Sequence, residues 1–267
     1  MRSSDSSSNR RGPGVLGCVG AAVAVVLVIL MVGVVTAMFT DVRSFQPREP
    51  IPENVPPAAA ASPPAINVHT EGRTSKKLAE WARGISAATG MSEAAVAAYG
   101  NAELIAKDSW PQCHLAWNTL AGIGHVETRH GTYNGNRLSP SRIDKDGIVR
   151  PTIIGVPLDG SPGFAEIPDT DGGELDGDPK WDRAVGPMQF IPSSWKQFGV
   201  DADGDGIANP NSIDDAAASS AKLLCDNDRD LSDPEGWTSA VKAYNQSNQY
   251  VRDVRDAAAN YALNQPA

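Results

Sequence analysis

Residues 113–131 read CHLAWNTLAGIGHVETRHG, and their apolar spacing predicts a helix that carries one carboxylate on its apolar face. At about 100° per residue, with Trp117 at zero, the apolar side chains fall between about 240° and 40° through zero. Glu127 falls at about 280°, inside this stripe. Gly131 is expected to end the helix, which places Glu127 in the last turn. The sequence therefore predicts a carboxyl group on the buried side of a helix end.

The chemistry open to Glu127 depends on the surroundings of its carboxyl group. Apolar surroundings and the negative end of the helix dipole both raise the pKa of a carboxyl group. A carboxylic acid that stays protonated near neutral pH can donate its proton to a glycosidic oxygen as the bond breaks. The alternative is a glutamate at a frayed helix end that points to solvent. A zinc site of the H-E-x-x-H kind is not indicated, because His125 and His130 diverge by about 140° on a helix.

A second stretch, AVGPMQFIPSSWKQFG at 184–199, predicts a tight turn followed by a short helix. Gly186 and the proline after it carry little side chain, so the backbone can approach a ligand closely at the turn. Gln189 is a neutral polar side chain between Met188 and Phe190, and its amide can hydrogen-bond a sugar. A buried structural glutamine fits the same pattern equally well.

The N-terminal part of the chain contains a long apolar span. Residues 15–39 are uncharged and would form a helix of about 37 Å, which is long enough to cross a bilayer. The span is longer than the apolar core of a signal peptide and lacks a clean cleavage site, which favours an uncleaved anchor over a cleaved leader. Arginines are more numerous before the span than shortly after it, so residues 1–14 are expected in the cytoplasm. This predicts a single-pass protein of the cell membrane with an extracytoplasmic domain.

The rest of the chain is expected to hold one domain behind a linker. Residues 40–74 are rich in Pro and Ala and predict a disordered linker, and residues 75–267 predict a mainly α domain. Helices are expected at 75–89, 92–110, 113–130, 214–225 and 236–262. Between 131 and 182, Gly, Pro and Asp predict a long irregular insertion, with a small strand or hairpin at IVRPTIIGV, 148–156. The net charge of -9 over 267 residues, without a basic cluster, excludes nucleic acid as the partner.

Two cysteines lie in the predicted domain, Cys113 and Cys225. An even pair outside the reducing cytosol is expected to form a disulfide, and the alternative is two buried free thiols. The bridge would close a loop of about 110 residues, for which chain entropy predicts a stabilisation of about 4–5 kcal/mol before strain.

Four motifs follow one another in the predicted domain. They are the helix end GHVETRHG, the turn AVGPMQFIPSSWKQFG, the acidic loop DADGDGIANPNSIDDA and the segment AYNQSNQYV. In this order they resemble the membrane-bound B-type lytic murein transglycosylases, whose catalytic domain is lysozyme-like. The resemblance covers about 75–261 and is weakest over 132–180. It implies cleavage of the β-1,4 bond between N-acetylmuramic acid and N-acetylglucosamine in peptidoglycan.

The resemblance also implies roles for individual residues. Glu127 would be the sole catalytic acid and base, and Tyr244 would form a wall of the cleft that can hydrogen-bond near its carboxylate. The substrate-binding residues that the resemblance implies are Gly186, Met188, Gln189, Phe190, Tyr244 and Asn245.

A single carboxylate suffices if the N-acetyl group of the substrate stabilises the oxocarbenium-like centre. Protonated Glu127 would then give its proton to the leaving oxygen and take one back from the muramoyl C6 hydroxyl, which closes a 1,6-anhydro ring. Two alternatives stay open. The insertion could supply a second acid for lysozyme-type hydrolysis, or the domain could be a peptidoglycan-binding scaffold without activity. The candidate second acids are Asp169, Asp171, Asp176 and Asp178.

The acidic loop begins like an EF-hand calcium loop, with alternating aspartates and Gly206 at the sharp turn. It departs from that pattern at the twelfth position, where Ser212 stands in place of the glutamate. The B-type enzymes have a longer loop, and the resemblance gives the last acid as Asp215. The ligands expected for a structural calcium are Asp201, Asp203, Asp205, the carbonyl of Ile207, and Asp215. The alternative is an Asp-Gly turn that caps the following helix, and the reaction itself requires no cofactor.

Overall fold

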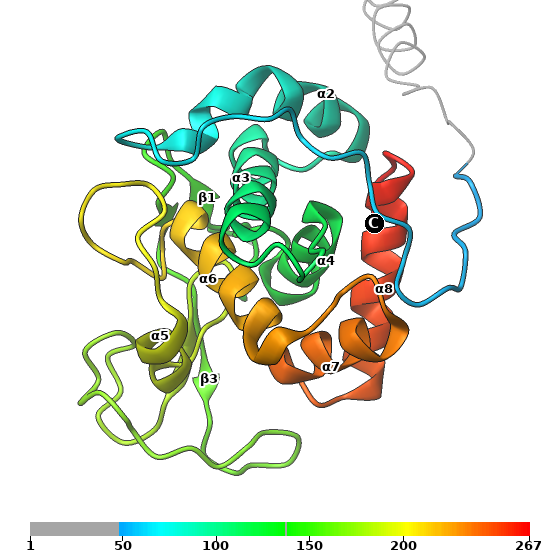
Figure 1. The fold of residues 1–267 in the computed structure, drawn as a ribbon. Helices are drawn as coiled ribbons and strands as arrows, with labels where there is room; N and C mark the ends of the chain where they lie inside the picture. Colours follow the sequence, from blue (N-terminus) through cyan, green and yellow to red (C-terminus); the bar gives the residue numbers. More distant parts are fainter. Residues whose placement is uncertain (1–47, 137) are drawn as a thin grey trace, which may run out of the picture. The chain divides into compact units, whose positions relative to one another are not determined.

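The computed structural model describes residues 48–136 and 138–267, of which 49–267 form one compact unit (Figure 1). The expected cytoplasmic tail 1–14 and membrane anchor 15–39 lie outside the described residues. Within the described ranges, no helix combines the length and the apolar character that a membrane crossing requires.

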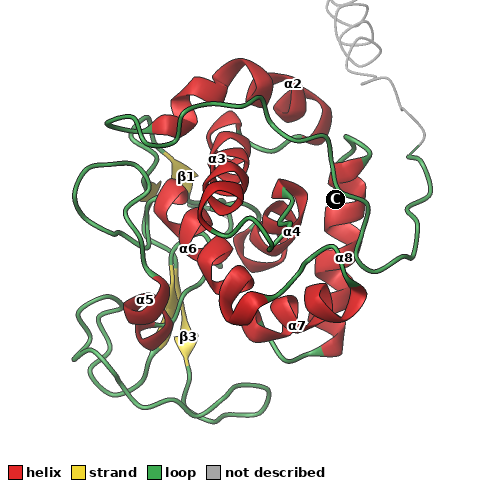
Figure 2. Ribbon diagram, in the orientation of Figure 1, coloured by secondary structure: helices red, strands yellow, loops and turns green. Residues whose placement is uncertain are grey.

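The described chain is mainly helical, with few and short strands (Figure 2). In chain order the elements are η1 (Thr74–Leu78), α2 (Ala79–Thr89), α3 (Glu93–Ser109), α4 (Trp117–Thr128), β1 (Arg142–Ile143), β2 (Val149–Arg150), β3 (Ile154–Pro157), β4 (Arg183–Val185), α5 (Pro192–Phe198), α6 (Ile213–Cys225), η2 (Asp226–Asp228), α7 (Pro234–Tyr244) and α8 (Asn248–Ala262). This confirms the mainly α class, and the arrangement fits a lysozyme-like domain.

Helices α3 and α4 lie at the centre, and α2, α6, α7 and α8 surround them (Figure 1). Small residues let the central helices pack closely. A Cβ added at Gly100 would lie 2.5 Å from Cζ3 of Trp81, and one added at Gly122 would lie 2.6 Å from the carbonyl oxygen of Val254. Any larger side chain at Gly122 would therefore force α4 and α8 apart.

Several helix boundaries differ from those expected, and α4 begins at Trp117 and not at Cys113. The stretch 236–262 divides into α7 and α8, because Ser247 caps α8 by accepting hydrogen bonds from the backbone N–H groups of Gln249 (3.2 Å) and Tyr250 (3.4 Å). Helix α4 ends at Thr128, before the expected stop at Gly131, because Arg129 already adopts the left-handed conformation, with φ of 51°.

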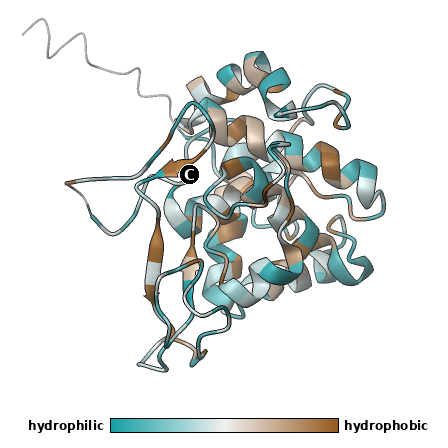
Figure 3. Cartoon of the chain, turned by 90° about the vertical axis from the view of Figure 1, so that its left-hand side faces the viewer, coloured by the Kyte–Doolittle hydropathy of each residue, from teal (hydrophilic) through white to brown (hydrophobic). Residues whose placement is uncertain are grey.

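The insertion is irregular, as predicted, but its strands pair differently from a single hairpin at 148–156. Strand β2 pairs antiparallel with β1, and β3 pairs antiparallel with β4, so the two halves of that stretch belong to different pairs. Pro151, which lacks a backbone N–H, lies between them. The loops of the insertion are mostly hydrophilic, whereas its short strands carry hydrophobic residues (Figure 3).

Part of the predicted linker packs on the domain. The amide of Asn118 donates to the carbonyl of Ala58 (3.0 Å), and its Oδ1 accepts from the backbone N–H of Ala60 (3.1 Å). The indole of Trp117 donates to the carbonyl of Ala61 (3.1 Å). An extended proline-rich segment has no internal hydrogen bonds, so its backbone groups are free to pair with buried side chains of α4. Residues 49–73 therefore differ from the disordered linker expected for 40–74, and we call the part at 55–63 the strap.

The predicted disulfide joins Cys113 to Cys225, with the two Cα atoms 5.3 Å apart. The bridge ties the segment before α4 to the last residue of α6. The alternative of two free thiols is wrong.

Candidate active site

Glu127 lies in the last turn of α4 and meets a tyrosine from α8. The hydroxyl of Tyr250 donates a hydrogen bond of 2.5 Å to Oε1 of Glu127. Glu127 is partly exposed, as a group that meets a substrate must be, yet burial among protein atoms raises the pKa of its carboxyl group to about 7. The hydrogen bond from Tyr250 opposes this rise, since it favours the charged form. The alternative of a glutamate that points freely to solvent is wrong.

Sequence reasoning did not identify Tyr250 and assigned its role to Tyr244. The hydroxyl of Tyr244 instead donates to the carbonyl of Met188 (2.7 Å) and shares a hydrogen bond with Oγ of Ser220 (3.0 Å). The rings of Tyr244 and Tyr250 are nearly parallel, with centroids 6.5 Å apart. Tyr244 therefore packs beside Tyr250 and stabilises the turn at residues 186–189, which we call the Gly-Pro-Met-Gln turn. Tyr250 belongs to the segment AYNQSNQYV itself, but nothing in that segment distinguishes it from Tyr244 as the partner of Glu127.

The Gly-Pro-Met-Gln turn lies directly against the end of α4. Oγ1 of Thr128, the residue after Glu127, donates to the carbonyl of Pro187 at 2.6 Å. The same oxygen accepts from the backbone N–H of Gly131 at 2.8 Å. The structure thus brings together two motifs that are about 60 residues apart in the chain, and the hydrogen bond from Thr128 connects them.

Three residues predicted to bind substrate face the interior instead. Gly186 has φ of 77°, and a Cβ there would lie 1.9 Å from the carbonyl oxygen of Pro210, so this glycine serves a close approach between two loops. The side chains of Met188 and Phe190 are buried, at 0% and 3% exposure. Their apolar character belongs to the core, which an isolated turn motif does not reveal.

Two of the predicted substrate-binding residues keep accessible amides. Gln189 is partly exposed, and its Nε2 donates to the carbonyl of Gly186 at 2.9 Å, which stabilises the turn. Asn245 is exposed at the end of α7, where its Oδ1 accepts from the backbone N–H of Ser247 at 2.9 Å. Each amide retains hydrogen-bonding capacity for a sugar hydroxyl or acetamido group.

Three of the predicted calcium ligands converge. Among the described residues, carboxylate oxygens of Asp201, Asp203 and Asp215 lie within 4.8 Å of one another. Burial, followed by the nearby carboxylate of Asp203, raises the pKa of Asp215 to about 7. Oxygen donors at this spacing fit a hard divalent cation. Asp205 lies outside this group and accepts from the backbone N–H of Ile207 (2.8 Å), whose side chain is 67% exposed.

The acidic loop also caps a helix and touches the Gly-Pro-Met-Gln turn. Ser212 caps α6 by accepting from the backbone N–H of Asp215 (3.3 Å), and its hydroxyl donates to Oδ2 of Asp203 (3.0 Å). The cap of α6 is therefore Ser212 and not the Asp-Gly turn itself, which meets this cap through the bond from Ser212 to Asp203. Through Pro210 the loop also meets Gly186.

The aspartates of the insertion serve their own loop. Oδ1 of Asp169 accepts from the backbone N–H groups of residues 171, 172 and 173, at 3.2, 2.9 and 3.1 Å. Asp171, Asp176 and Asp178 likewise accept backbone N–H groups two to seven residues further along the chain. Most of these bonds are of the Asx-turn kind, which gives these carboxylates a structural role in the loop.

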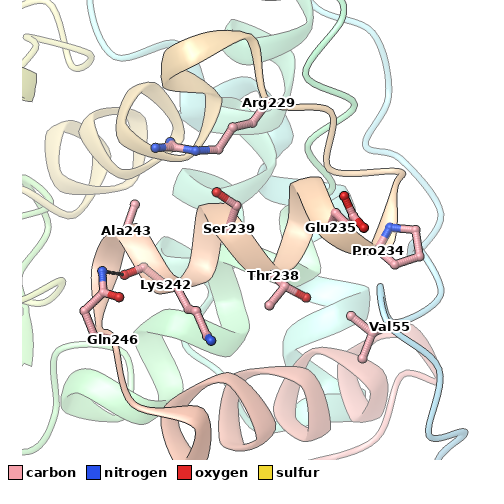
Figure 4. Close-up of a pocket in the computed structure, with 9 residues that line it drawn as sticks. All are labelled: Val55, Arg229, Pro234, Glu235, Thr238, Ser239, Lys242, Ala243 and Gln246. Atoms are coloured by element: carbon pink, nitrogen blue, oxygen red, sulfur yellow. Dashed lines mark hydrogen bonds between the residues drawn. The ribbon is translucent and has the colours of Figure 1, made fainter.

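A cavity of about 740 Å³ runs along α7, lined by residues that include Val55, Arg229 and Lys242 (Figure 4). Beside it, Nε2 of Gln246 donates to the carbonyl of Lys242 at 2.7 Å. Glu127 is not among the residues that line this cavity.

Residues 174–262 match the family model of the transglycosylase SLT domain. This supports an enzyme of the lytic transglycosylase and lysozyme-like superfamily that acts on peptidoglycan. The matched range contains the Gly-Pro-Met-Gln turn, the acidic loop and Tyr250 of α8, whereas Glu127 on α4 precedes it. Comparison with curated proteins and with solved structures finds no match.

Proposed function

We propose that this domain is a B-type lytic transglycosylase, which cleaves the β-1,4 bond between N-acetylmuramic acid and N-acetylglucosamine. The observation that carries the proposal is the carboxyl group of Glu127, whose pKa is raised to about 7 at a partly exposed helix end. A group with this pKa is both an acid and a base at neutral pH. The match to the transglycosylase domain over 174–262 supports the same substrate.

In the proposed first step, protonated Glu127 donates its proton to the glycosidic oxygen while the bond from that oxygen to muramoyl C1 breaks. The N-acetyl group of the muramoyl residue stabilises the positive charge at C1. The Tyr250 hydroxyl, already bonded to Oε1, stabilises the carboxylate that this step leaves behind.

In the proposed second step, the Glu127 carboxylate takes the proton from the C6 hydroxyl of the same muramoyl residue. The oxygen of that hydroxyl forms the new bond to C1, which closes the 1,6-anhydro ring. Glu127 is protonated again, and no water is consumed. One carboxyl group thus serves both steps, in keeping with the structural roles of the aspartates in the insertion.

We further propose that calcium binds Asp201, Asp203 and Asp215 and has a structural role. The cation would neutralise three converging carboxylates and stabilise the loop that packs against Gly186. The disulfide between Cys113 and Cys225 supports an oxidising compartment, and with the apolar span 15–39 it favours a membrane-anchored protein with an extracytoplasmic domain.

The proposal is tested by digestion of purified peptidoglycan with the fragment 49–267 and mass spectrometry of the released muropeptides. Products that end in 1,6-anhydromuramic acid are expected. Reducing ends would instead favour a lysozyme-type hydrolase. Binding to peptidoglycan without any release would favour a scaffold without activity. Glu127→Gln is the control, since it retains the shape of the side chain and removes the titrating group.

A further inference from the structure

A chain of hydrogen bonds runs through the side chains on either side of Glu127. Nη1 of Arg129 lies 2.8 Å from Nε2 of His125, and Nδ1 of His125 lies 3.0 Å from the hydroxyl of Tyr261. That hydroxyl lies 2.8 Å from Nε2 of His130, whose Nδ1 lies 3.2 Å from the hydroxyl of Tyr99. His130, Tyr261 and Tyr99 are buried, so these contacts are shielded from water.

One assignment of the protons gives every donor in this series of hydrogen bonds an acceptor. Arginine only donates, so Nε2 of His125 accepts and its Nδ1–H donates to Tyr261. The Tyr261 hydroxyl then donates to Nε2 of His130, and the Nδ1–H of His130 donates to Tyr99. The hydroxyl of Tyr99 is left to donate to Sδ of Met188, which lies 3.9 Å away.

This direction requires both histidines to be neutral, with the proton on Nδ1. The surroundings agree, because burial lowers the pKa of His130 to about 3 and also lowers that of His125. A proton added to Nε2 of His130 would turn an acceptor into a donor and leave the Tyr261 hydroxyl proton without a partner. The assignment with neutral histidines therefore satisfies every donor of the hydrogen-bond network, which ends at Met188 of the Gly-Pro-Met-Gln turn.

The chain holds the backbone around Glu127 in an unusual conformation. Arg129 and His130 both have positive φ, 51° and 60°, which is uncommon for residues other than glycine. Helix α8 supplies both Tyr250, which bonds Glu127 itself, and Tyr261, which bonds the histidines on either side of it. Between these two tyrosines, α8 meets α4 closely at Gly122.

We propose that His130 and Tyr261 are positioning residues, which hold the last turn of α4 so that the carboxyl group of Glu127 meets Tyr250 and the substrate. The inference rests on the proposed function of Glu127. The positioning residues touch neither substrate nor reacting atoms. They act through the backbone between His125 and His130.

The test compares Tyr261→Phe with Thr74→Val. The first variant removes one hydroxyl from the hydrogen-bond network. The second removes a buried hydrogen bond of 2.9 Å between Thr74 and Asn101, which is not part of that network. Tyr261→Phe is expected to lower kcat for peptidoglycan cleavage about tenfold or more with KM within about twofold of wild type, because a small misplacement of a catalytic group slows chemistry strongly. Thr74→Val is expected to leave kcat within about twofold. Equal kcat values for the two variants would overturn the proposal.

A second measurement does not depend on activity, so it separates a failure of this inference from a failure of the proposed function. Nitrogen-15 NMR of the full chain should find His125 and His130 neutral with the proton on Nδ1. Carbon-13 NMR should show that the titration midpoint of the Glu127 carboxyl group falls in Tyr261→Phe, as water reaches the group, and is unchanged in Thr74→Val. A proton on Nε2 of His130, or the same midpoint in both variants, would overturn the proposal even if the wild-type protein cleaves peptidoglycan.

Discussion

The hydroxyl of Tyr250 donates a hydrogen bond of 2.5 Å to Oε1 of Glu127, across the contact between α8 and α4. A catalytic carboxyl group that gives up its proton and takes it back needs a partner that tolerates both forms. Tyr250 donates to the carboxylate and remains protonated itself, because burial raises the pKa of its hydroxyl well above the usual value. The pair therefore fixes the orientation of the acid without competing for its proton.

Tyr250→Phe is expected to shift the pH dependence of cleavage. The first step needs protonated Glu127, so the rate should decline as the pH rises through about 7. Loss of the hydrogen bond removes a contact that favours the carboxylate, so the pKa of Glu127 should rise and the decline should move to higher pH. We also expect kcat to fall about tenfold. Tyr133→Phe, at an exposed tyrosine, is the control. If the cleavage rate of Tyr250→Phe declined at the same pH as that of the wild type, the role of this hydrogen bond would be contradicted.

Glu127→Gln is expected to stabilise the domain at neutral pH while it abolishes cleavage. In the folded protein the pKa of Glu127 is about 7, above the ordinary value of 4.5. Between pH 4.5 and pH 7 the carboxyl group is therefore ionised in the unfolded chain and still protonated in the folded protein. The free energy of unfolding is therefore lowered as pH rises, by up to about 3 kcal/mol above pH 7. Calorimetry should find a higher Tm for Glu127→Gln at pH 8 and little difference at pH 4. Exposed Glu80→Gln is the control, and a pH-independent difference for Glu127→Gln would refute a buried acid.

Removal of the strap is expected to destabilise the domain. A fragment that starts at residue 64, just after the strap, loses the partners of Trp117 and Asn118, which are buried at 0% exposure. At about 1 kcal/mol for each of three hydrogen bonds, the loss is about 3 kcal/mol, or a fall in Tm of roughly 6–12 °C. Thermal melting of the fragments 49–267 and 64–267 measures the difference. Equal Tm values would show that the strap adds nothing to stability.

Calcium is expected to raise the Tm of the domain and a chelator to lower it. Asp201, Asp203 and Asp215 repel one another, and a bound cation removes this repulsion. Asp201→Asn removes one of the three carboxylates and should therefore reduce the rise in Tm that calcium produces. Asp253→Asn, on the exposed side of α8, should leave the response intact. Calorimetric titration that detects no calcium binding to the wild-type chain would exclude the site.

The raised pKa of Glu127 agrees with the apolar surroundings that the sequence predicted for this carboxyl group. The predicted stripe was only partly informative, because the structure also buries Asn118 and Thr119, which lie off the stripe, and leaves Glu127 partly exposed. The disulfide was predictable from the even number of cysteines in the domain. The Gly-Pro turn was also predictable, although the reason for Gly186 was not, since its close neighbour Pro210 is distant in sequence.

The features that the sequence did not reveal are tertiary. Tyr250 meets Glu127 only because α8 crosses the end of α4, and nothing in the spacing of either helix indicates that crossing. Met188 and Phe190 flank a polar glutamine in a turn, where alternation cannot distinguish a cleft from the core. The strap forms neither helix nor strand, so its sequence has no periodic pattern to detect. Its hydrogen bonds are made with side chains of α4, which lie far away in the sequence.

Digestion of peptidoglycan in water enriched in oxygen-18 tests the single-glutamate mechanism most directly. If Glu127 closes the 1,6-anhydro ring, the released muropeptides contain no oxygen-18 at C1, and Glu127→Gln releases none at all. Muropeptides with a reducing end that carries one atom of oxygen-18 would contradict the account, because water and not the C6 hydroxyl would then have attacked C1.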